Sequence, residues 1–171
     1  TFDPVDVFST TIGKNGALLD IDGDTDLDMI VSGSISDTND PTELIHAYIN
    51  DGTGLFTKVN SKFVAQPGVE HARQWLVDDF NNDGRDDLIV ADHGLDRGSF
   101  PGEKNLLLIN NGAGQLEDKT ATSLSVKSTF THGVSSGDVN GDGFADLFLN
   151  NALVDTSSFF TAEKEGRLWI N

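Results

Sequence analysis

The chain repeats one acidic loop three times, and this repeat constrains the fold more than any other feature. Each copy is nine residues long, and its first residues, Asp20, Asp79 and Asp138, are separated by 59 residues and again by 59. A short apolar run typical of a β-strand follows each loop. A regular internal period of this length predicts an array of similar structural units.

A second element recurs with the loops. Residues 46–56 and 106–116 each contain an apolar run, an Asn/Asp-Gly turn and a second run. Such turns favour positive φ and predict β-hairpins. Residues 167–171 match the start of a third copy.

Each repeat therefore predicts about four short strands: one before the acidic loop, one after it, and a hairpin pair. We expect an all-β fold of β-propeller blades, with repeats at about 1–55, 56–115 and 116–171 in one array. Three blades are too few to close a ring. We therefore expect them to form part of a larger propeller or to be completed by oligomerisation.

The composition excludes several classes of partner and chemistry. The net charge of −17 disfavours nucleic acid and anionic membrane surfaces, because nothing would neutralise their phosphates. No apolar run approaches the length of a membrane span, so we expect no membrane insertion. The absence of cysteine excludes disulfides and thiol catalysis, while 37% apolar residues suffice for a core.

The acidic loops predict about three Ca²⁺ ions, one in each repeat. Oxygen-bearing side chains stand at loop positions 1, 3, 5 and 9, and a backbone carbonyl at position 7 completes a set that suits a hard cation. The predicted ligands, with the carbonyl donor of each loop last, are Asp20, Asp22, Asp24, Asp28 and Asp26; Asp79, Asn81, Asp83, Asp87 and Arg85; and Asp138, Asn140, Asp142, Asp146 and Phe144.

An EF-hand and an ordinary solvated turn are two other interpretations of these loops. An EF-hand requires a glutamate at position 12, where this chain has Val31, Val90 and Leu149. Ordinary solvated turns explain one such loop better than three in register. The first loop carries Thr25 where the others have glycine at position 6, so we expect a more strained bend there.

The pattern Asp-x-Asn-x-Asp-Gly-x-x-Asp-Leu, at 79–88 and 138–147, resembles the FG-GAP/VCBS repeat of integrin-α-like β-propellers. The hairpin at 108–116 is similar to the one that family carries between its calcium loops. The resemblance implies calcium-stabilised blades, usually about seven in a closed propeller. It also implies an extracellular or cell-surface role in adhesion or ligand binding.

A catalytic interpretation depends on the four histidines. A lyase or hydrolase of polysaccharides could use a histidine base and an arginine that binds a uronate carboxylate. The side chains considered for it are His46, His71, His93, His132, Arg73, Trp75 and Asp92. Histidines that cap strands are the commoner case, so we expect no enzymatic activity.

The favoured function is a calcium-binding module for adhesion, recognition of a protein or glycan ligand, or assembly. Phe100, Phe159 and Phe160 lie in the variable loops between the strand that follows an acidic loop and the next hairpin, where they could stack on sugars or anchor a partner, or equally pack over a blade edge. A self-assembling ring or filament and a polysaccharide-degrading enzyme are the alternatives.

Overall fold

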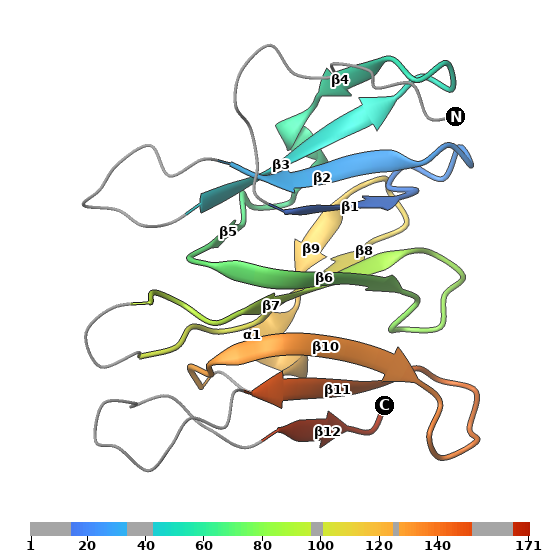
Figure 1. The fold of residues 1–171 in the computed structure, drawn as a ribbon. Helices are drawn as coiled ribbons and strands as arrows, with labels where there is room; N and C mark the ends of the chain where they lie inside the picture. The colour runs from blue at the N-terminus through green and yellow to red at the C-terminus, as the bar shows by residue number, and fades with distance from the viewer. Residues whose placement is uncertain (1–14, 34–42, 97–100, 125–126, 152–165) are drawn as a thin grey trace, which may run out of the picture.

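The computed structural model describes residues 15–33, 43–96, 101–124, 127–151 and 166–171. Within them the chain forms three antiparallel sheets and very little helix (Figure 1). None of the helices in these ranges is long and apolar enough to cross a membrane. Phe100, Phe159 and Phe160 lie outside the described residues.

With one exception in the first sheet, strands that follow one another in sequence are neighbours in space. The first sheet contains β1 (Gly16–Leu19), β2 (Asp28–Ser32), β3 (Glu43–Asn50) and β4 (Phe56–Lys58), with β5 (Gly68–Val69) paired to β3. The second contains β6 (Ala72–Asp78), β7 (Asp87–Asp92), β8 (Leu106–Asn110) and β9 (Leu116–Asp118). The third contains β10 (Thr131–Gly137), β11 (Asp146–Asn151) and β12 (Arg167–Trp169).

This antiparallel meander confirms the predicted blade architecture. The three sheets stack without closing into a ring (Figure 1). The predicted repeat boundaries at 55/56 and 115/116 fall inside hairpins, because β4 pairs with β3 and β9 with β8. Two short helices, η1 (Asn60–Lys62) and α1 (Thr120–Ser123), follow β4 and β9.

Strand β7 is buried on both of its faces by the stacking of the sheets. Leu88 and Val90 pack in the core shared with the first sheet, while Ile89 and Ala91 pack in the core shared with the third. Both faces are covered, so the strand is continuously apolar instead of alternating. In contrast, Phe148 of β11 is 43% exposed on the outer face of the third sheet.

The first strands of the three sheets, β1, β6 and β10, lie in neighbouring layers (Figure 1). Side chains connect these layers: Asn15 Nδ2 donates to the Ala72 carbonyl at 2.7 Å, and Gln74 Oε1 accepts from the Val134 N–H at 3.0 Å. The acidic loops leave these strands on the right-hand side of Figure 1, so all three lie on the same side of the stack, at one end of the strands.

Candidate functional site

The three acidic loops share one backbone conformation. Positive φ occurs at position 4 in Gly23, Asn82 and Gly141, and at position 6 in Thr25, Gly84 and Gly143. Thr25, with φ of 78°, is a β-branched residue in a region that favours glycine, which confirms the strained bend expected in the first loop. The requirement at position 4 was not predicted, although only Gly and Asn stand there.

The position 1 aspartates organise the turn. Each carboxylate accepts hydrogen bonds from backbone N–H groups three to five residues later, and in all three loops the position 6 N–H is among the donors. These donors hold the pKa of Asp138 below its usual value, the Gly143 N–H most strongly. The donors are Gly23 and Thr25 to Asp20; Asp83 and Gly84 to Asp79; and Gly141, Asp142 and Gly143 to Asp138.

Positions 3 and 5 place further oxygens in the same turn. One carboxylate oxygen of each position 5 aspartate accepts the position 7 N–H at 2.9–3.0 Å, in Asp24, Asp83 and Asp142. The position 3 amides of Asn81 and Asn140 donate to the other carboxylate oxygen of their position 5 aspartate, at 3.2 and 2.8 Å.

The position 9 aspartates, Asp28, Asp87 and Asp146, are at most 1% exposed. Each carboxylate accepts two backbone N–H groups. One belongs to position 2 of its own loop, and the other belongs to an asparagine at or just after the end of the third strand of its sheet, Asn50, Asn110 or Asn171. In the second sheet these donors are Phe80 and Asn110, at 3.0 and 2.8 Å. Burial raises the pKa of Asp87 to about 6 and also raises that of Asp28. Position 9 therefore ties each loop to its sheet.

The first loop gathers ligand atoms most clearly. Carboxylate oxygens of Asp20, Asp22 and Asp28 all lie within 4.8 Å of one another. The Oδ1 atom of Asp22 is buried and has no hydrogen-bond partner among the described residues. A buried carboxylate oxygen without a donor, in a set made of oxygen ligands only, fits a hard cation. Lys62 approaches from outside, with its Nζ atom 3.0 Å from Asp22 Oδ2.

Position 7 was predicted to offer its carbonyl, and its side chain has a separate contact. In the first two loops the position 7 side chain covers the glycine of the adjacent hairpin turn. A Cβ added to Gly52 would lie 2.5 Å from the Asp26 side chain, and a Cβ added to Gly112 would lie 3.1 Å from the Arg85 side chain. The Arg85 Nη1 atom also lies 3.4 Å from Asp83 Oδ2, so a guanidinium group lies beside the carboxylates of the second loop. Phe144, its counterpart in the third loop, is 39% exposed.

Neighbouring sheets are joined through the loops by residues that sequence reasoning missed. Asn110 Nδ2 donates to the Ile21 carbonyl at 3.0 Å, and Asn171 Nδ2 donates to the Phe80 carbonyl at 2.6 Å. Each bond runs from the hairpin asparagine of one sheet to position 2 of the preceding loop. The recurrence of asparagine at these hairpin positions was the available signal.

A second cluster lies at the opposite end of the strands. Of the residues considered for catalysis, the structure brings together His71, Arg73, His93 and His132, and it adds Asp96, which the sequence did not single out. Burial, with a smaller contribution from the Arg73 guanidinium, lowers the pKa of His93 to about 4, so this ring is neutral at pH 7.

The other residues considered for catalysis have structural roles. Asp92 accepts backbone N–H groups of Glu70, His71 and Gly94. Trp75 packs against the core shared by the first two sheets. His46 lies apart on β3, where its Nδ1 atom contacts Asn60 at 3.3 Å.

Comparison with known families matches residues 79–149 to an FG-GAP-like repeat and residues 130–170 to an FG-GAP repeat. No curated protein matches the chain. The two matches cover the second and third acidic loops and the strands around them. The first loop shares their positive-φ positions and their carboxylate–backbone hydrogen bonds. The chain therefore belongs to the FG-GAP repeat family.

Proposed function

We propose that the chain is a calcium-binding β-propeller module that acts outside the cell in adhesion, ligand recognition or assembly. The observation that carries the proposal is the threefold loop, whose oxygen-bearing positions and backbone conformation repeat in all three copies. FG-GAP repeats are typical of extracellular proteins, which supports the location.

Calcium has a structural role in this proposal. An ion in the first loop would be held by Asp20, Asp22, Asp24, Asp28 and the Asp26 carbonyl, and the other loops would supply their equivalents. Three divalent ions would change the net charge from −17 to about −11. A cation would also satisfy Asp22 Oδ1, and leaving such a buried acceptor unpaired costs about 1–3 kcal/mol.

The open third sheet supports an assembly role. Ile21 and Phe80, at position 2 of the first two loops, are 1% and 9% exposed beneath the next sheet, whereas Val139 at the same position is 63% exposed. Phe148, Leu168 and Ile170 are also between 43% and 55% exposed. Another sheet of the same kind, from a longer array or a second copy, would cover this apolar surface.

The histidine cluster supports one alternative, a polysaccharide lyase or hydrolase, although FG-GAP repeats are generally not enzymes. Turnover of a uronate-containing polymer by the wild-type chain, lost in His71→Gln and His132→Gln, would favour the enzyme. No turnover of such polymers would favour the binding module.

The calcium proposal is tested by thermal unfolding in chelator and in excess calcium. Calcium at 100 times its dissociation constant contributes about 2.7 kcal/mol for each occupied loop. For a chain of this size, each occupied loop should therefore raise the melting temperature in calcium by about 5–11 °C. Asp79→Ala, which removes the first ligand of the second loop, should reduce the difference, while Asp118→Ala on β9 should retain it. Equal melting temperatures, with no calcium found by elemental analysis, would contradict the proposal.

A further inference from the structure

Three metal-ligating side chains converge at the end of the sheets away from the acidic loops. His71 precedes β6, while His93 and Asp96 follow β7. One ligand atom from each lies within 4.8 Å of the other two. Asp96 Oδ2 is 3.7 Å from both His71 Nδ1 and His93 Nε2. Strand β6 separates this group from the acidic loop of its sheet by about 20 Å.

His93 is the best-defined member of the group. Its side chain is fully buried, and its Nε2 atom has no hydrogen-bond partner among the described residues. That atom faces Asp96. The ring is packed between His71 and Phe130, with centroid distances of 4.4 and 4.5 Å. A buried nitrogen without a partner, in a ring held by packing, is an unexplained donor or acceptor.

The other ring nitrogen of His93 lies within hydrogen-bond distance of a second histidine. His93 Nδ1 lies 3.2 Å from His132 Nε2, on β10 of the third sheet. When Nδ1–H donates to His132, Nε2 carries a free lone pair that faces Asp96. A hydrogen bond from the second ring nitrogen fixes the tautomer and orientation of a metal-ligating histidine.

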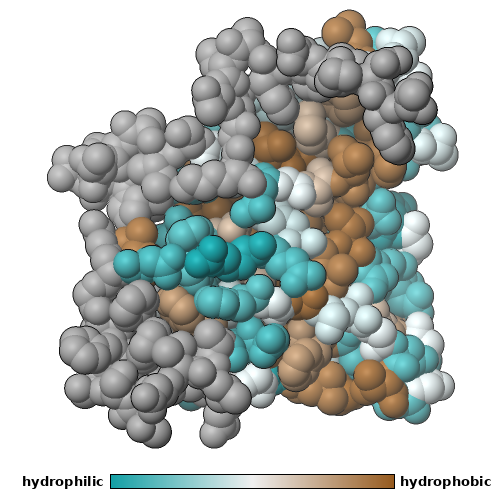
Figure 2. Space-filling model, viewed as in Figure 1, coloured by the Kyte–Doolittle hydropathy of each residue, from teal (hydrophilic) through white to brown (hydrophobic). Residues whose placement is uncertain are grey.

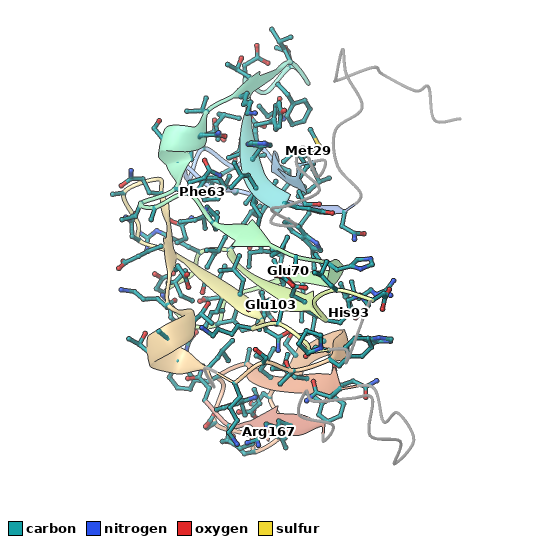
Figure 3. All side chains as sticks on the ribbon, turned by 90° about the vertical axis from the view of Figure 1, so that its left-hand side faces the viewer. Met29, Phe63, Glu70, His93, Glu103 and Arg167 are labelled. Carbon is teal, nitrogen blue, oxygen red and sulfur yellow. The ribbon has the colours of Figure 1, made fainter. Side chains whose placement is uncertain are left out.

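The spacing suits a small divalent transition ion. A tetrahedron with bonds of about 2.1 Å has edges of about 3.4 Å. Two edges of the group are 3.7 Å, so ligation requires shifts of only a few tenths of an ångström along them. His71 and Asp96 are partly exposed, with 30% and 47% of their side chains accessible, which leaves the outer position open to water. Polar side chains gather there over the starts of β6 and β10 (Figure 2), and Figure 3 shows His93 in this region.

Arg73 competes with a metal ion for this group. Its Nη2 atom lies 3.2 Å from Asp96 Oδ2, and its Nε atom lies 3.3 Å from His93 Nδ1. His93 Nδ1 cannot accept from Arg73 while it donates to His132, so ligation through Nε2 excludes the Arg73 contact. The guanidinium should therefore weaken metal binding without abolishing it.

We propose that His71, His93 and Asp96 form an open site for a divalent transition ion such as zinc, with His132 as a positioning residue. Two imidazole nitrogens and one carboxylate distinguish this site from the oxygen-only loops, because imidazole favours zinc-class ions over calcium. The site joins the second and third sheets, since His132 belongs to β10. It goes beyond the proposed calcium function and does not depend on it.

The test is calorimetric titration of the full chain with zinc in excess calcium, which keeps the acidic loops saturated. We expect one zinc ion per chain. His71→Gln and Asp96→Asn should each weaken binding at least about 100-fold, and Arg73→Gln should strengthen it about tenfold by removing a nearby positive charge. His46→Gln, which alters a histidine outside the cluster, should bind as the wild-type chain does.

Cobalt provides a spectroscopic readout of the ligands. Co²⁺ bound at the site should give visible absorption, and His132→Gln should shift the bands and weaken binding about 10–100-fold while the stoichiometry stays at one. His71 and Asp96 are partly exposed, so circular dichroism can verify that their variants are folded. Absence of zinc binding by the wild-type chain, or equal binding by folded His71→Gln and Asp96→Asn, would overturn the proposal.

Discussion

Replacement of Thr25 by glycine should stabilise the protein. Thr25 adopts φ of 78°, while the glycines at the same loop position, Gly84 and Gly143, adopt 82° and 89°. A non-glycine residue in this region costs about 1–3 kcal/mol. Glycine also gives the unfolded chain greater conformational freedom, which reduces the gain in stability by about 0.4–1 kcal/mol. The expected gain in unfolding free energy is therefore about 0.5–2 kcal/mol.

Gly84→Thr provides the reverse experiment. A Cβ added to Gly84 would meet nothing within 4 Å, so the substitution introduces backbone strain without a steric clash. It should lower the unfolding free energy by a similar 0.5–2 kcal/mol. Thr57→Gly on the exposed strand β4 is the matched control, since glycine there relieves no strain and should destabilise the chain by about 0.5–1 kcal/mol.

Urea unfolding of these variants, followed by circular dichroism in chelator, measures the free energies without a contribution from metal. Thermal scans should show Thr25→Gly melting about 2–4 °C higher for each kcal/mol gained. If Thr25→Gly leaves stability unchanged or lowers it, the positive φ of Thr25 is not a source of strain and the reasoning is refuted.

Two further substitutions test the connections made by the loops. Asp87→Asn removes one of two acceptors for the N–H groups of Phe80 and Asn110 and should cost about 1–3 kcal/mol in urea unfolding at pH 4, where the wild-type carboxyl is protonated in the folded chain. Because the pKa of Asp87 is raised from 3.8 to about 6, its stabilising contribution in chelator is full below pH 4 and is lost as the pH rises through 6. Asp87→Asn should remove this dependence of the unfolding free energy on pH. If the variant retains the dependence, other groups cause it. Asn110→Ala leaves the Ile21 carbonyl of the neighbouring sheet unpaired. It should cost about 1 kcal/mol more than Asn50→Ala, because the Asn50 amide donates to the Leu27 carbonyl of its own sheet. Equal losses of unfolding free energy would exclude a contribution of the inter-sheet bond to stability.

Most of the strand pattern could be predicted from the sequence because the longer strands border recognisable turns. The apolar run predicted to follow the second acidic loop is β7, Asp87–Asp92, and the hairpin predicted at 106–116 contains β8 and the start of β9. The two-residue strand β5 and the four-residue helix α1 were not predicted, because elements this short contain too little periodicity to detect.

The roles within the loops were predictable only in part. Spacing alone identified the oxygen-bearing positions, but it could not show that Asp28, Asp87 and Asp146 also accept two backbone N–H groups each. Those bonds depend on how the hairpin folds back over the loop. The asparagine bonds between sheets and the position of Asp96 beside His71 depend on tertiary packing, and neither is encoded in local spacing.

A crystal structure grown with calcium, with the ions located by anomalous scattering, would show directly whether the three acidic loops bind calcium. We expect one ion in each of the three loops, bound by side-chain oxygens of positions 1, 3, 5 and 9 and by the position 7 carbonyl. A structure with all three loops ordered and no ion in any of them would contradict this expectation.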